Sequence, residues 1–357
     1  MKYSQVFHNT LPSEELSKLI SDMPKVEIHV HLEGATNPEL LFKMAERNHV
    51  HLPVKTIEEW KTYYAFQDFN HFIEVYMLTV SCMQSPLDFQ EMVVDFMRRQ
   101  AENRIEYCEI FFSSSLHIHR LPGDEILQAL KEGVRLGREK YKVDLALIPD
   151  ISRETCVEKA AQRAVLDFAL KAREMGVGIG LGIGGKEIGF PCELYRETIE
   201  EAARQGLHVV AHAGETGHPD FINEVLDVLK PERIGHGVHS IEDPQLMRRL
   251  RESQIPLEVS PQSNYCTRVI DTNKAHPLRE LVDNGLFCTV NTDDPSMFST
   301  DLVNEYLTLA AQGFTLEELW NLNLNGLQST FIDEGRKKKM SLAWQEWYDK
   351  SRPIEQE

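Results

Sequence analysis

The chain has 357 residues, of which 42% are hydrophobic and 26% charged, a profile typical of a globular protein with one large α/β domain or two smaller ones. Its formal net charge of -18 disfavours nucleic acids and anionic membranes as partners and favours a small neutral or cationic molecule. The six cysteines form no CxxC pair. No apolar run reaches the roughly 18 residues of a membrane span, and no signal peptide is visible. We therefore expect a cytoplasmic protein.

Eight short apolar, β-branched runs predict β-strands. They are residues 26–31, 105–112, 144–151, 176–183, 207–212, 233–237, 256–260 and 287–292. Amphipathic stretches separate them, for example 191–205, 244–253 and 277–284, each of which begins with proline, as many helices do.

This alternation favours parallel strands joined by helices, and eight such units close a (β/α)8 barrel of about 250 residues. We therefore predict a single domain over residues 1–357, with a helical insertion at about 36–103 and a C-terminal helical extension. The alternative is an open doubly wound sheet, which would carry a glycine-rich phosphate turn after the first strand. "HLEGAT" does not look like such a turn.

Three histidine pairs have the spacing HxH. His49 and His51 follow a predicted helix and precede a proline, which favours an exposed loop. His117 and His119 lie in the turn-rich segment "SSSLHIHRLPGD", a candidate loop at a pocket mouth, and a metal-binding role is not favoured for them.

The third pair, His29 and His31, lies in "KVEIHVHLEG", where polar and apolar residues alternate. Alternation places both imidazoles on one face of a strand, about 6.5–7 Å apart along the chain, so that both can reach one ion beyond the strand end. This pair alone is weak support for a metal site.

Other polar residues follow predicted strands at the same end. His212 ends the fifth strand and Glu215 follows it, His236 ends the sixth, and Asp293 and Asp294 follow the eighth. Active sites of (β/α)8 barrels form at the carboxyl ends of the strands, so we predict one shared site.

The residue types indicate metal-assisted hydrolysis at an electrophilic carbon. The candidate ligands are His29, His31, His212 and Asp293. This nitrogen and oxygen set suits Zn²⁺, which lowers the pKa of bound water to about 7. His236 would orient that water or take its proton, Glu215 would carry a proton to the substrate, and Asp294 would hydrogen-bond the substrate. The other zinc-deaminase pattern, HxE with PCxxC, is absent from the sequence.

The motifs "HVHLEGA", "HAGET", "ERIGHG", "LEVSPQSN" and "VNTDDPSMF" resemble, in order and spacing, those of the adenosine deaminase family of the amidohydrolase superfamily. The resemblance covers about residues 25–331. It implies a (β/α)8 barrel with one zinc ion per chain and hydrolytic loss of ammonia from the 6-position of an adenine-type ring.

Matching positions imply roles for individual residues. The zinc ligands are the four named above. Glu215 would protonate ring N1, His236 would activate water and Asp294 would contact N7. Gly185, in "GIGGKE", matches the glycine of the family's "DLAGDE", whose backbone faces purine N3.

Several departures concern the substrate. Glu33 stands where adenosine deaminases have the aspartate of "HLDGA" that contacts ribose, as in adenine-deaminase-like relatives. "EIFFSS" replaces "E-x-R-x-S-P", with Phe111 for arginine and Ser114 for proline, and Gly182 replaces the aspartate of "DLAGDE". We expect Glu33, Gly185 and Asp294 to bind the substrate.

We favour adenosine or a 5′-substituted adenosine as substrate, such as 5′-methylthioadenosine or aminodeoxyfutalosine, because "GIGGKEIGFP" and "LEVSPQSN" look closer to nucleoside-using relatives. The alternatives are free adenine and a different amidohydrolase C–N hydrolysis with two metals. The second metal would need a carboxylated lysine, and Lys186 lies past the fourth strand, where a loop lysine is favoured. A non-catalytic purine-binding protein is disfavoured by the intact Glu215, and we expect a monomer or homodimer.

Overall fold

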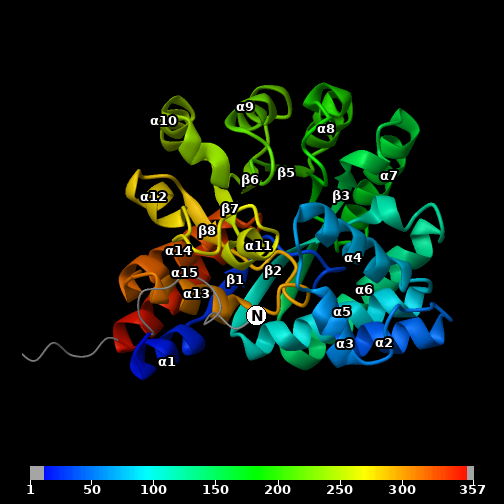
Figure 1. Ribbon diagram of the computed structural model, residues 1–357, viewed down its shortest axis with the longest axis horizontal. Helices are drawn as coiled ribbons and strands as arrows, with labels where there is room; N and C mark the ends of the chain where they lie inside the picture. The colour runs from blue at the N-terminus through cyan, green and yellow to red at the C-terminus, as the bar shows by residue number, and fades with distance from the viewer. Residues whose placement is uncertain (1–11, 352–357) are drawn as a thin grey trace, which may run out of the picture.

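The computed structural model describes residues 12–351 and shows eight parallel strands, hydrogen-bonded in chain order and surrounded by helices (Figure 1). The strands are β1 (Lys25–Glu27), β2 (Ile105–Phe112), β3 (Asp144–Ser152), β4 (Gly180–Gly184), β5 (His208–Ala213), β6 (Arg233–His236), β7 (Leu257–Val259) and β8 (Cys288–Val290).

The two edges of this sheet meet just beyond β8 and β1. Val30 and Asp293 form a parallel bridge, in which the His31 amide donates to the Asp293 carbonyl at 2.8 Å and the Asp293 amide donates to the His29 carbonyl at 3.1 Å. This contact closes the barrel and confirms the predicted (β/α)8 fold.

Helices occupy the predicted insertion and the C-terminal extension. Between β1 and β2 lie α2 (Pro38–Arg47), α3 (Ile57–Tyr63), α4 (Phe69–Ser81) and α5 (Pro86–Glu102). The other helices are α1 (Glu14–Asp22), α6 (Gly123–Tyr141), α7 (Lys159–Glu174), α8 (Arg196–Arg204), α9 (Pro219–Val228), α10 (Pro244–Ser253), α11 (Pro261–Cys266), α12 (Leu278–Asp283), α13 (Leu302–Ala311), α14 (Leu316–Ser329) and α15 (Glu334–Ser351). Short 3-10 turns are η2 (Ser114–Leu116), η3 (Arg153–Thr155), η4 (Cys192–Leu194) and η5 (Val238–Glu242).

Local sequence explains where several helices begin. Asn37 caps α2 by accepting a hydrogen bond from the Leu40 amide, and Pro38 stands in its first turn. Asp243 caps α10 in the same way. The α10 bounds agree with the predicted 244–253, whereas the predicted helix 191–205 is divided into η4 and α8.

The first strand is shorter than predicted, for a specific reason. The amides of Ile28 and His29 both donate to the side-chain oxygen of Asn291, each at 3.1 Å, instead of to a neighbouring strand. Regular pairing therefore ends at Glu27, and it resumes only as isolated bridges, of Val30 with Asp293 and of His31 with Phe111.

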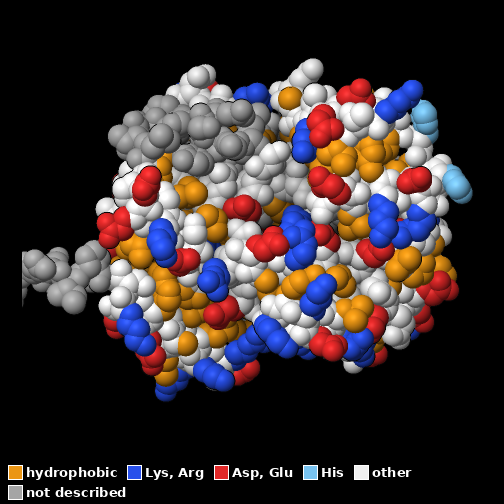
Figure 2. All heavy atoms as spheres, turned by 90° about the horizontal axis from the view of Figure 1, so that it is seen from below, with side chains coloured by type: hydrophobic (Ala, Val, Ile, Leu, Met, Phe, Trp, Pro, Cys, Tyr) orange, Lys and Arg blue, Asp and Glu red, His pale blue; other side chains and the backbone are white. Residues whose placement is uncertain are grey.

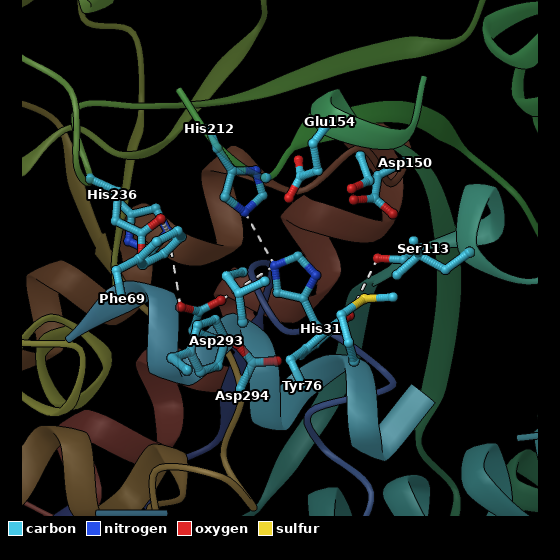
Figure 3. Close-up of a pocket in the computed structure, with 17 residues that line it drawn as sticks. His31, Phe69, Tyr76, Ser113, Asp150, Glu154, His212, His236, Asp293 and Asp294 are labelled. Atoms are coloured by element: carbon cyan, nitrogen blue, oxygen red, sulfur yellow. Dashed lines mark hydrogen bonds and ion pairs between the residues drawn. The ribbon is translucent and has the colours of Figure 1, made fainter. Parts of the chain in front are cut away.

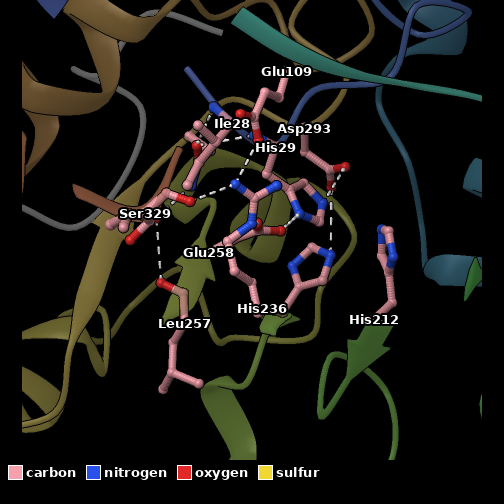
Figure 4. Close-up of polar contacts among 12 residues, drawn as sticks. Ile28, His29, Glu109, His212, His236, Leu257, Glu258, Asp293 and Ser329 are labelled. Carbon is pink, nitrogen blue, oxygen red and sulfur yellow. Dashed lines mark hydrogen bonds and ion pairs between the residues drawn. The ribbon is translucent and has the colours of Figure 1, made fainter. Parts of the chain in front are cut away.

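A buried ion-pair network fills part of the barrel interior (Figure 4). The Arg233 guanidinium lies 2.5 Å from the Glu109 carboxylate and 2.6 Å from that of Glu258, and it stacks over the Phe331 ring at 3.9 Å. It also donates to the Ser329 carbonyl at the end of α14, which ties the C-terminal helices to the barrel.

The surface seen in Figure 2 carries acidic and basic side chains interspersed, without a continuous basic field. Within residues 12–351, no helix combines the length and the apolar character that a bilayer crossing requires.

Candidate functional site

The four predicted ligands meet at the carboxyl end of the barrel. His31 Nε2 lies 3.1 Å from His212 Nε2 and 3.3 Å from Asp293 Oδ1 (Figure 3). His29 Nε2 lies 3.5 Å from the same oxygen. His29, His212, His236 and Asp293 offer ligand atoms that all lie within 4.8 Å of one another. The structure therefore brings His236 to the same place.

Neighbouring groups orient the imidazoles towards this point. His29 Nδ1 donates to Glu258 at 2.7 Å, so that Nε2 faces Asp293 (Figure 4). His212 Nδ1 donates to the Ile183 carbonyl at 3.1 Å, which likewise leaves Nε2 as the free nitrogen. This arrangement of the outer nitrogens is typical of metal-binding histidines.

The backbone at two of these positions is strained. His236 and Asp293 both have a φ of 64°, in the left-handed region that non-glycine residues seldom adopt. Such strain is commonly found at functional sites.

The residues fit a metal ion. His29 Nε2 is buried and makes no hydrogen bond within the part of the chain that the structure describes. An unpaired buried nitrogen is costly, and a cation held between it, the other imidazoles and Asp293 would satisfy it. Ser263 donates to the other Asp293 oxygen at 2.6 Å and so fixes the carboxylate.

Burial and neighbouring charges determine which side chains of this centre are ionised. Burial lowers the pKa of His236 to about 3 and, with the charges of His29 and His31, lowers that of His212, so both imidazoles are neutral. Burial opposes ionisation of Asp293, but the adjacent imidazoles of His29 and His31 hold its pKa well below the usual range.

Two carboxyl groups beside this anion have the opposite shift. Burial, followed by the charges of Asp293 and Glu187, raises the pKa of Glu215 well above its usual value. Burial and then the charge of Asp293 raise the pKa of Asp294 in the same way. Both shifts favour the protonated forms, which can donate protons or hydrogen bonds.

A pocket opens from this centre and is covered by α4. Apolar side chains of α4 form one wall; they are Phe69, Phe72, Ile73, Tyr76 and Met77. Asp150, Ser113 and Glu154 also line the pocket, and Asp150 and His236 lie on opposite sides of His31 in Figure 3. The cavity is small, with a free volume of about 70 Å³.

The family model described as adenosine deaminase matches residues 24–346. The chain belongs to the adenosine deaminase family. It is 36% identical over 331 residues to the adenine deaminase of Geotalea uraniireducens, with 92% of each chain covered. It is 37% identical over 324 residues to the adenine deaminase of Acinetobacter baylyi, with 90% of this chain and 96% of the other chain covered.

A solved structure agrees with these relatives. The crystal structure of adenine deaminase from Arthrobacter aurescens has a TM-score of 0.86 and 32% identity, and covers 92% of this chain and 99% of its own. An amidohydrolase solved with bound zinc, at 23% identity and a TM-score of 0.89, shares the fold. The protein is thus a purine deaminase of the adenosine deaminase family.

Other predicted substrate residues of this deaminase lie in different settings. Gly185, with a φ of +79°, and Asp294 line the pocket. Glu33 is fully buried behind it, where one oxygen, Oε1, accepts hydrogen bonds from the Ser113 amide at 3.0 Å and from His117 Nε2 at 2.9 Å. Its other oxygen, Oε2, has no hydrogen-bond partner among residues 12–351.

The histidines of the other two HxH pairs and Lys186 lie away from the candidate metal ligands. His117 is buried and bound to Glu33, while His119 is exposed. His49 and His51 are exposed in the loop after α2, as predicted. Lys186 is an exposed loop residue, also as predicted, and it does not belong to the candidate metal cluster found among the described residues.

The structure links two departures from the family pattern. The Phe111 ring packs against the rings of His29, His31 and His212, with centroids 4.9, 5.0 and 5.1 Å apart. A Cβ added to Gly182 would lie 2.9 Å from both the Phe111 ring and the Asp150 Cβ. Phenylalanine at 111 therefore requires a glycine at 182, because any larger side chain there would collide with the ring.

Sequence reasoning missed several acidic residues around this site, among them Asp150, Glu187 and Glu258. Each is a single carboxylate in a strand or loop, without a spacing that sets it apart. Asp150 had the clearest signal, because it stands near the carboxyl end of the predicted third strand.

Proposed function

We propose that this enzyme hydrolyses free adenine to hypoxanthine and ammonia, with one zinc ion per chain. The relatives at 36–37% identity are named adenine deaminases, which favours adenine over the adenosine derivatives that the sequence motifs favoured. It also accords with Glu33, which stands in place of the ribose-contacting aspartate.

The buried Asp150 carboxylate is the main structural support for adenine as the substrate. It is 2% exposed, and its Oδ1 has no hydrogen-bond partner within the described chain. Burial raises its pKa to about 6, so it remains largely an anionic acceptor near pH 7. Free adenine has an N9–H that such an acceptor would bind, whereas adenosine has a sugar in place of that hydrogen.

The wall formed by α4 supports the same choice. Phe72 and Tyr76 are buried and line the small cavity, so a sugar on N9 would need more room beside this helix than the free base does.

Zinc is the metal that we propose, because three imidazoles and one carboxylate form a set that it prefers and that leaves a position for water. The ligands would be His29, His31, His212 and Asp293. A bound zinc ion supplies a Lewis acid that lowers the pKa of water to about 7.

The chain's own residues would then move protons and hold the base. Protonated Glu215 donates to ring N1, which increases the electrophilicity of C6, and neutral His236 takes a proton from the attacking water. Protonated Asp294 donates to N7, and the Gly185 backbone faces N3. Glu33, buried behind the pocket, would hold the backbone of Ser113, which lines it.

The test compares adenine with 9-methyladenine, which lacks the N9–H but is only slightly larger. We expect kcat/KM of the wild-type enzyme to be about 100-fold higher for adenine than for 9-methyladenine. This ratio combines the loss of one hydrogen bond to a buried charge with the steric cost of the methyl group. Asp150→Ala should lower kcat/KM for adenine and bring the ratio close to one.

Adenosine serves as a second probe in the same assay. An unchanged adenine to 9-methyladenine ratio in Asp150→Ala would contradict the role of Asp150. Faster deamination of adenosine than of adenine by the wild type would contradict the proposed substrate.

A further inference from the structure

Glu187 lies in the loop after β4 and has a buried carboxylate, 2% exposed. This carboxylate accepts three hydrogen bonds from successive backbone amides: Gly214 at 2.8 Å, Glu215 at 2.9 Å and Thr216 at 3.0 Å. Three converging N–H groups form an anion-binding nest, which here is filled by the protein's own side chain.

The three amides belong to the loop that carries the side chain of Glu215 into the pocket. The first amide follows directly on β5, and the loop ends before α9. The position of the Glu215 carboxyl group therefore depends on where the Glu187 carboxylate holds its backbone.

The local sequence leaves space for this arrangement. Gly214 has a φ of +69°, which favours glycine and lets the chain turn its amides inward. A Cβ on Gly217 would overlap the Glu187 carboxylate, so glycine at this position admits the carboxylate to the nest.

A buried arginine ties the same two loops from another direction. The Arg153 guanidinium donates to the Gly185 carbonyl at 3.1 Å and to the His212 carbonyl at 2.6 Å. The β5 segment is thus held by Arg153 at the ligand His212, and by Glu187 at the proton donor Glu215.

We propose that Glu187 is a positioning residue for the reaction: it holds the backbone of Glu215 so that the carboxyl group reaches the substrate nitrogen. Glu187 is not one of the residues that line the pocket, so it acts through Glu215 and not by touching the purine. The proposal rests on the proposed function only in that adenine deamination provides the readout.

The first test is Glu187→Gln, which keeps the size of the side chain but replaces one accepting oxygen with an NH2 group. We expect kcat for adenine to fall about 10- to 100-fold, the cost of a misplaced catalytic group, with KM changed less than about threefold. Metal content, measured by elemental analysis, should stay that of the wild type.

Asp88→Asn is the matched control. Asp88 is also a fully buried carboxylate that accepts backbone hydrogen bonds, from the amides of Gln84 at 2.9 Å and Ser85 at 2.7 Å, but it lies at the start of α5, away from the pocket. This variant should lose stability and keep the wild-type kcat.

A double-mutant cycle separates positioning from general destabilisation. In single turnovers with excess enzyme, Glu187→Gln should have little further effect once Glu215 is replaced by glutamine, because it acts through that carboxyl group. Gly217→Ala, which crowds the Glu187 carboxylate, should lower kcat in the same direction as Glu187→Gln.

Two results would overturn the proposal: a wild-type kcat in Glu187→Gln, or a loss of equal size in the Glu215→Gln background. A wild-type enzyme that releases no ammonia from adenine would instead contradict the proposed function, so the two failures are distinguishable.

Discussion

At the scale of single residues, His236 is supported by a chain of neutral groups. The Leu278 amide donates to His276 Nδ1 at 3.1 Å, His276 Nε2 donates to the Asn264 oxygen at 3.0 Å, and the Asn264 amide group lies 3.4 Å from His236 Nδ1. These contacts require His276 to be neutral, because its Nδ1 must accept a hydrogen bond.

The buried state of His276 has a consequence for stability. Burial lowers the pKa of His276 from 6.5 to about 3 in the folded protein. As the pH falls, His276 is therefore protonated in the unfolded chain before it is protonated in the folded protein. Stability from this residue is present above pH 6.5 and is lost below it. Between about pH 7 and about pH 5, we expect a loss of about 2 kcal/mol from this group.

Urea unfolding of the metal-loaded protein across this range measures the effect. His276→Gln should be less stable than the wild type at pH 7. Its free energy of unfolding should fall less steeply as the pH is lowered, by the slope that corresponds to about one bound proton, because glutamine does not titrate. Equal slopes for the wild type and the variant would contradict this explanation.

At the scale of elements, α4 covers the pocket and should therefore limit how much of a substrate the pocket admits. Phe72 contacts the rings of Tyr76 and Phe298, with centroids 5.8 and 5.3 Å apart, and so holds the helix over the cavity. We expect Phe72→Ala to widen the pocket, raise KM for adenine about 10-fold and relax discrimination against 9-substituted adenines.

The measurement is the ratio of kcat/KM for adenine and adenosine, with Leu87→Ala as control. Leu87 is 45% exposed on the neighbouring α5, so its removal should alter neither value. A Phe72→Ala enzyme with the wild-type ratio would show that α4 does not limit the substrate.

The elements also show what the sequence can predict. Strand β2 and helix α10 have the predicted bounds, because apolar pattern, caps and turn residues all agree there. Strand β1 ended early because Asn291, more than 260 residues away, takes its amide hydrogen bonds, and no local pattern reports such a contact.

In the site, too, the residues set by the order of the strands could be predicted, and those set by distant contacts could not. His212, His236 and Asp293 were predicted together because parallel strands place their carboxyl ends at one face of a barrel. Glu258 and Glu187 could not be predicted, since their roles depend on which distant nitrogen each carboxylate meets. The cover formed by α4 depends likewise on packing between separate elements.

At the scale of the whole molecule, the metal site coincides with the seam of the barrel. The bridge between Val30 and Asp293 joins the first and last strands, and the proposed ligands His29 and His31 flank it. A barrel closed in this way holds the proposed ligands from both ends of the chain at fixed distances, as the proposed one-zinc site would require.

The most direct test of the account is a titration of metal-free enzyme with zinc while adenine deamination is followed by the loss of adenine absorbance. Activity should rise linearly and reach its plateau at one zinc ion per chain. No turnover of adenine at any zinc concentration, or a plateau at two ions per chain, would contradict it.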